Sequence, residues 1–153
     1  IFIQETLEMI YKITLAAVLG MSIGLEREHI RKPAGLRTYT LVALGATLFT
    51  ILSQNIGGEA VAYDPSRIAS QVVVGIGFIG AGIIFIRGGH IEGLTTAAGL
   101  WTTAAIGMAV GFGFYTVAVF SAILSLAVLL LLRQIEKNIP KIPPNDLPEN
   151  ENS

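Results

Sequence analysis

Five long apolar segments, separated by short polar connections, constrain the fold of this 153-residue chain more than any other feature of its sequence. They lie at about residues 7–25, 36–54, 68–86, 94–110 and 114–132. A helix needs about 20 apolar residues to cross the hydrocarbon core of a bilayer. Only 14% of the residues are charged, against about 25% in soluble domains. The sequence therefore predicts an all-α polytopic membrane bundle of five transmembrane helices.

The Lys and Arg residues are distributed unequally between the two sides of this predicted bundle. Eight of the ten fall beside the first connection, the third connection and the C-terminal segment, namely Arg27, Arg31, Lys32, Arg37, Arg87, Arg133, Lys137 and Lys141. Because such residues accumulate in cytoplasmic loops, we expect the N-terminus outside and the C-terminus inside. Residues 1–133 would form the membrane domain, and the proline-rich, polar residues 134–153 a disordered cytoplasmic tail.

The third segment contains "GIGFIGAG" (75–82), which matches the G-x-G-x-x-G spacing of a dinucleotide-binding turn. That turn lies between a strand and a new helix, whereas these glycines lie within a segment that an N-cap at Asp64 already opens as a helix. Small residues let membrane helices approach closely. We therefore expect the third helix to be the hub of the bundle, packed on two sides. The predicted packing glycines are Gly75, Gly77, Gly80, Gly82, Gly99 and Gly107.

Four side chains are candidates for a polar path or a partner-binding face. They are Gln71, Thr95, Thr102 and Trp101. The alternative is ordinary helix packing, with the threonine hydroxyls bonded to carbonyls one turn back. Trp101 lies in the middle of its segment, so its indole N–H is expected to need a buried acceptor. The bulky fifth segment is expected to be the most exposed to lipid.

Charged residues gather in the first and third connections, where they predict a cytoplasmic mouth. This mouth comprises Glu26, Arg27, Glu28, Arg37, Arg87, His90 and Glu92. Its carboxylates, Glu26, Glu28 and Glu92, are candidate Mg²⁺ ligands. The alternative is a hydrated interface in which basic side chains reach the lipid headgroups, and the neighbouring arginines oppose a cation. No catalytic motif is present, and a net charge of −1 gives no support to nucleic-acid binding.

Several motifs together resemble the MgtC/SapB family of bacterial membrane proteins. They are "GLERE" (24–28), "KPAGLRTYTLVALGATLFT" (32–50), "DPSRIASQVVVGIGFIGAG" (64–82) and "GLTTAAGLWTTAAIGMAVGFG" (93–113). The resemblance covers residues 15–132, the transmembrane domain, and not the cytoplasmic ACT-like domain into which many members continue. It implies an inner-membrane protein linked to adaptation to low Mg²⁺ and, in pathogens, to survival inside host cells.

Some members of that family are thought to restrain the F-type ATP synthase. The resemblance therefore implies a non-enzymatic regulator that contacts another membrane complex. We expect no cofactor, and the one exception to consider is Mg²⁺ at the carboxylates of the cytoplasmic mouth. Its partners would be the lipid bilayer and that complex, or a second copy of the chain. The alternative is a transporter or channel for an ion or small solute, with its path near Gln71, Thr95 and Thr102.

Overall fold

The computed structural model describes residues 2–55, 64 and 66–139, and the predicted five helices are confirmed there. They are α1 (Phe2–His29), α2 (Leu36–Asn55), α3 (Ser66–Ala81), α4 (Leu94–Gly111) and α5 (Tyr115–Asn138), with a small hairpin of β1 (Phe85–Arg87) and β2 (His90–Glu92) between α3 and α4. Four of them, α1, α2, α4 and α5, are long and apolar enough to cross a membrane, whereas α3 has only 16 residues.

Two helix ends differ from the sequence prediction. The third helix ends at Ala81 and not near residue 86, because Gly88 and Gly89 both adopt positive φ (58° and 79°) and close a tight hairpin. Consecutive positive φ angles are typical of the two-residue turns that suit the twist of a hairpin. The fifth helix continues to Asn138, so the first residues of the expected tail are helical. Residues 140–153 lie outside the described part of the chain.

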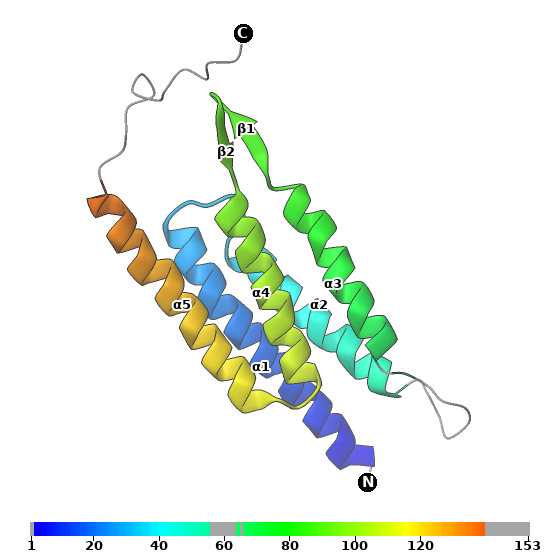
Figure 1. Cartoon of the computed structure of the whole chain (residues 1–153). Coiled ribbons are helices and arrows are strands. Elements are labelled where there is room, and N and C mark those ends of the chain that lie inside the picture. The colour runs from blue at the N-terminus through cyan, green and yellow to red at the C-terminus, as the bar shows by residue number, and fades with distance from the viewer. Residues whose placement is uncertain (1, 56–63, 65, 140–153) are drawn as a thin grey trace.

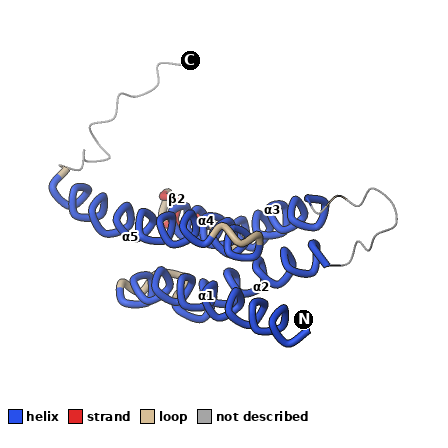
Figure 2. The backbone as a smooth tube through the Cα atoms, turned by 90° about the horizontal axis from the view of Figure 1, so that it is seen from below, coloured by secondary structure: helices blue, strands red, loops and turns tan. Residues whose placement is uncertain are grey.

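The helices form two layers. Figure 2 shows α1 and α2 in one layer and α3, α4 and α5 in the other. Successive helices run in opposite directions, so that the α1–α2 turn, the β-hairpin and the end of α5 lie at one end of the molecule (Figure 1). The basic residues of the α1–α2 turn, β1 and the last turns of α5 are thereby collected at that same end.

The hub of the bundle is α4, and the expectation that the third helix would take this place is wrong. Among the described residues, α4 packs against all four other helices, whereas α3 makes its main helix contacts with α2 and α4. Most of α3 is exposed, and its buried residues, Ala69, Ile76 and Gly80, form a single face. The glycines of α3 permit close packing on two sides, but within the described residues only one side is used.

A buried layer of small and hydroxyl-bearing residues joins α2 to α4. The Thr47 hydroxyl lies 2.7 Å from the carbonyl oxygen of Gly107 on α4 and 2.9 Å from that of Ala43 on its own helix. A Cβ at Gly107 would lie 3.1 Å from the Cα of Ala43 and still closer to its carbonyl oxygen. The helices therefore approach closely because position 107 has no side chain.

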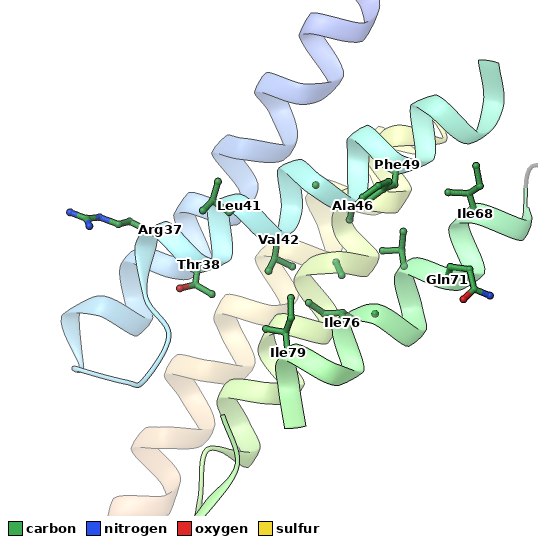
Figure 3. Close-up of a pocket in the computed structure, with 14 residues that line it drawn as sticks. Arg37, Thr38, Leu41, Val42, Ala46, Phe49, Ile68, Gln71, Ile76 and Ile79 are labelled. Carbon is green, nitrogen blue, oxygen red and sulfur yellow. The ribbon is translucent and has the colours of Figure 1, made fainter. Parts of the chain in front are cut away.

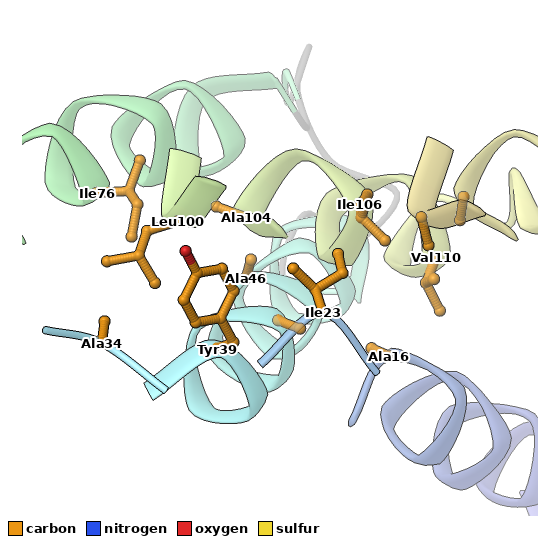
Figure 4. Packing of buried hydrophobic residues seen from close by; sticks show 13 residues of the cluster. Ala16, Ile23, Ala34, Tyr39, Ala46, Ile76, Leu100, Ala104, Ile106 and Val110 are labelled. Atoms are coloured by element: carbon orange, nitrogen blue, oxygen red, sulfur yellow. The ribbon is translucent and has the colours of Figure 1, made fainter. Parts of the chain in front are cut away.

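The main apolar core lies between these layers, around Tyr39, Leu100 and Ile23 (Figure 4). By contrast α5 has the smallest buried share of the four long helices. Its large side chains, among them Phe120 and Leu131, are exposed. This agrees with the expectation that the fifth segment is the least covered by protein.

Candidate functional site

Arg27 is buried at the end of α1, and the side chain of Glu26 beside it is 8% exposed. The sequence predicted both residues in the cytoplasmic mouth. The side chain of Arg27 is 3% exposed, and its Nη1 lies 3.4 Å from Oε2 of Glu26. Within the described part of the chain, Oε1 of Glu26 and both Nε and Nη2 of Arg27 have no hydrogen-bond partner. Removing charges from water is costly unless they are paired and hydrogen-bonded. This ion pair therefore leaves charged atoms at the end of α1 without hydrogen-bond partners among the described residues.

Tyr39 links this end of α1 to α4. Its ring is fully buried, and its hydroxyl donates a hydrogen bond of 3.2 Å to the carbonyl oxygen of Thr96. A Cβ at Gly99 would lie 2.6 Å from the Tyr39 oxygen, so the missing side chain at Gly99 makes room for the phenol.

The spacing of residues along α1 indicates that Arg27 is buried. Arg27 follows the buried residues Ala16, Gly20 and Ile23 at helical spacing, so all four lie on the same face of the helix.

The other residues of the predicted mouth are spread over separate elements. Oε2 of Glu28 accepts a hydrogen bond of 3.1 Å from the backbone N–H of Leu36 and so caps the start of α2. Arg87, His90 and Glu92 are exposed on the β-hairpin.

These positions bear on the proposed Mg²⁺ ligands. Among the described residues, no group of three or more His, Cys, Asp or Glu is arranged to hold a metal ion. Glu26, Glu28 and Glu92 therefore do not form a common Mg²⁺ site in this structure.

A hollow of about 680 Å³ lies between α2 and α3, and we call it the α2–α3 groove. Gln71 and Gly75 line it from α3, Arg37 and Thr38 lie at the end where α2 begins, and Ala104 is the contribution of α4 (Figure 3). Most of its remaining lining is aliphatic. Gln71 is exposed, so its amide is not buried against another helix of the described chain.

Thr95 and Thr102 lie in a different hollow, of about 310 Å³, which is bounded by α1, α4 and α5. The structure therefore does not place them on one path with Gln71. The Thr102 hydroxyl donates a hydrogen bond of 3.0 Å to the carbonyl oxygen of Ala98, one turn back on α4. This is the hydrogen bond expected if Thr102 serves ordinary helix packing. Trp101 is 54% exposed, so the expected buried acceptor for its indole is not required.

The six predicted packing glycines divide into two groups. Gly99 and Gly107 lie against α2, and a Cβ at Gly80 would be 3.5 Å from the Cβ of Ala97 on α4. By contrast, a Cβ at Gly75 or Gly77 would meet no other heavy atom within 4 Å, and one at Gly82 would meet only carbonyl oxygens of the preceding turn. These three glycines are not used for packing between the described helices.

Several long apolar helices packed around a hub of small residues, with large side chains facing outward, define a polytopic helical membrane protein. The MgtC family model matches residues 13–138. The chain belongs to the MgtC family.

Curated relatives agree with this assignment. The chain is 46% identical over 135 residues to the Escherichia coli K12 protein named "Putative magnesium transporter YhiD", covering 85% of this chain and 63% of the relative. It is 46% identical to Protein MgtC of Brucella abortus, over 78% of this chain and 49% of that protein, and 41% identical to Protein MgtC of Salmonella typhimurium, over 88% and 56%. The chain thus spans about half to two thirds of the length of these relatives. No solved structure matches it.

Proposed function

We propose that this chain is a non-enzymatic regulator that binds another membrane complex through the outer face of α3. This face consists of Ser70, Val74, Gly77 and Ala81, which are spaced by four, three and four residues and are all exposed. The observation that carries the proposal is the open space at Gly77, where an added Cβ would meet no other atom within 4 Å. Small residues at this spacing allow a second transmembrane helix to approach the backbone closely.

The proposed setting is the bacterial inner membrane, with five crossings, the N-terminus outside and the C-terminus inside. The alternating helix directions support this arrangement, because they bring the start of α2, β1 and the end of α5 to one end of the bundle (Figure 1). These elements carry Arg37, Arg87, Arg133 and Lys137. Basic residues on one side favour a cytoplasmic location for that side. The 16 residues of α3 rise about 24 Å, which is close to the ~30 Å of the hydrocarbon core.

The regulated process would be adaptation to low Mg²⁺. Family membership supports this link, as do the names of the relatives, two of which are called MgtC and one "Putative magnesium transporter YhiD". The proposed partner is a membrane complex such as the F-type ATP synthase. A second copy of the chain is the alternative partner for the same face.

The test compares two leucine substitutions on α3 in cells grown at low Mg²⁺. Gly77→Leu places a large side chain on the outer face of α3, whereas Gly75→Leu places it in the α2–α3 groove. Both positions have open space around the added Cβ, so both variants are expected to fold. We expect Gly77→Leu to reduce the ATP synthase subunits that co-purify with the tagged chain at least tenfold, and Gly75→Leu to leave them unchanged. Equal recovery with Gly77→Leu and the wild type would refute the proposed face.

A transporter is the second candidate function. The name of the Escherichia coli relative favours it. The carboxylate of Glu26, which is 8% exposed, also favours it, since ionisable groups within a membrane protein often mark ion pathways. Purified protein in vesicles loaded with a Mg²⁺-sensitive dye separates the two candidates. A regulator should give the same Mg²⁺ influx as protein-free vesicles. An influx that Glu26→Gln abolishes would favour the transporter.

A further inference from the structure

We propose that the α2–α3 groove binds an anionic phospholipid, with one acyl chain between the two helices and the headgroup beside Arg37. The proposal does not depend on the regulator function, because the groove and the outer face of α3 use different residues. Three features carry it, namely the apolar lining of the groove, its length, and the positive charge confined to one of its ends.

The lining of the groove suits a thin apolar group such as an acyl chain. Its walls carry Leu41 and Phe49 from α2 and Ile79 from α3. Its depth comes from Gly45 and Gly75, at which an added Cβ would meet no other heavy atom within 4 Å. Branched side chains on both walls and glycines between them leave a channel along the helices (Figure 3).

The length of the groove matches one leaflet of a bilayer. From Arg37 to Phe49 the helix rises about 18 Å at 1.5 Å per residue. One leaflet contributes about half of the ~30 Å hydrocarbon core. An acyl chain that starts at the Arg37 end would therefore reach the middle of the membrane near the Phe49 end.

The charge at the Arg37 end favours an anionic headgroup. Arg37 is exposed, and its side chain extends outward from the start of α2, with Thr38 beside it (Figure 3). Arg31 and Lys32 are exposed in the turn that precedes α2. The nearby carboxylate of Glu28 is bonded to the backbone N–H of Leu36. Basic pockets between membrane helices on the cytoplasmic side recognise anionic lipid headgroups.

The shape of the groove favours an acyl chain over a partner helix. A helix is about 10 Å across, whereas α2 and α3 contact each other beside the groove, and the contacts of both with α4 close its base. A single acyl chain is far thinner than a helix, so it can enter the groove without separating α2 from α3.

The experiment is a titration of the purified chain in detergent with phosphatidylglycerol or phosphatidylcholine, followed by native mass spectrometry. The wild type should bind phosphatidylglycerol more tightly than phosphatidylcholine. Arg37→Gln should weaken phosphatidylglycerol binding about fivefold, the effect of about one basic residue near a lipid headgroup, and should leave phosphatidylcholine unchanged. Arg133→Gln, which removes a charge from exposed α5, is the matched control and should bind as the wild type does.

Filling the groove tests the acyl-chain part of the proposal. Gly75→Leu and Gly45→Leu enter the groove from opposite walls, and both should weaken the binding of both lipids. Gly77→Leu is the control, because it lies on the same helix but outside the groove. The proposal is overturned if Arg37→Gln keeps the preference for phosphatidylglycerol, or if both groove variants bind lipid as Gly77→Leu does. Occupation of the groove by another protein, unaffected by added lipid, would also overturn it.

Discussion

Replacing Gly107 with alanine tests whether the close approach of α2 and α4 holds the bundle together. The added Cβ would lie 3.1 Å from the Cα of Ala43 and nearer still to its carbonyl oxygen. Both are backbone atoms of α2, so no side chain can turn aside to make room. The two helices would have to move apart by at least about 0.5 Å to restore ordinary contact. The same movement would lengthen the 2.7 Å contact between the Thr47 hydroxyl and the Gly107 carbonyl oxygen.

The expected change in the free energy of unfolding combines two destabilising effects and one stabilising effect. Overpacking of a tight contact costs about 1–3 kcal/mol, and hydrogen bonds between membrane helices average about 0.6 kcal/mol. Alanine, however, favours the helix over glycine by about 1 kcal/mol. We therefore expect Gly107→Ala to destabilise the chain by about 0.5–2.5 kcal/mol. The control is Gly77→Ala, which makes the same chemical change in open space and should stabilise by up to about 1 kcal/mol.

The assay is reversible unfolding in mixed micelles of increasing dodecyl sulfate content, followed by circular dichroism and by the fluorescence of Trp101, the only tryptophan in the sequence. The two alanine variants should differ by about 1.5–3.5 kcal/mol. If Gly107→Ala is as stable as Gly77→Ala, the contact between α2 and α4 is not tight and the reasoning fails.

Two further predictions concern single polar groups. Tyr39→Phe removes the buried bond to the Thr96 carbonyl oxygen and should lower the free energy of unfolding by about 0.5–1.5 kcal/mol; the same micelle assay measures it, and an unchanged stability would mean that the bond contributes nothing. At the start of α3, the Ser66 hydroxyl and backbone N–H hold the pKa of Asp64 below its ordinary value. The carboxylate therefore stabilises the helix start above the unfolded pKa of about 3.9, and this contribution is lost as the pH falls through the lower folded pKa. After correction for the intrinsic effect of pH, amide hydrogen exchange at the start of α3 should accelerate at acidic pH in the wild type and not in Asp64→Asn. The same pH dependence in both proteins would contradict the role of the Asp64 carboxylate at the helix start.

The sequence was sufficient for the number of helices, because segments of about 20 apolar residues leave few alternatives. It also predicted the helix start at Asp64, whose side chain accepts a 2.9 Å hydrogen bond from the N–H of Ser66. The end of α3 was misplaced, since the apolar run continues through Ile86 into a strand. The paired glycines at 88–89 held the signal for the turn, but apolar composition alone does not separate a short strand from a helix.

The identity of the hub was harder to predict, because glycine permits close packing without requiring it. The third helix has the denser glycines, yet Gly75 and Gly77 face open space. In α4 the decisive feature is the spacing of Thr96, Thr103 and Gly107, which places them on the face that α2 covers. Which small-residue face meets a neighbour depends on how the helices are arranged, and a single sequence does not contain that information.

The burial of the Glu26–Arg27 pair was missed for a related reason. Both residues lie at the end of a span, where charged side chains normally reach water. Only the helical spacing from Ala16, Gly20 and Ile23 to Arg27 indicates an inward direction. The separation of Gln71 from Thr95 and Thr102 could not be predicted, since it depends on α4 lying between the two hollows.

The central place of α4 also sets an order for biosynthesis. The full set of contacts between α1, α2 and the hub cannot form until the end of α4 at Gly111 has left the ribosome. At about 5–20 residues per second, the newly inserted α1–α2 pair waits several seconds after α2 is complete. During that interval Thr47 lacks its acceptor on Gly107, and Tyr39 lacks its acceptor on Thr96. The early helices are therefore exposed to the insertion machinery and to quality-control proteases until the fourth helix arrives.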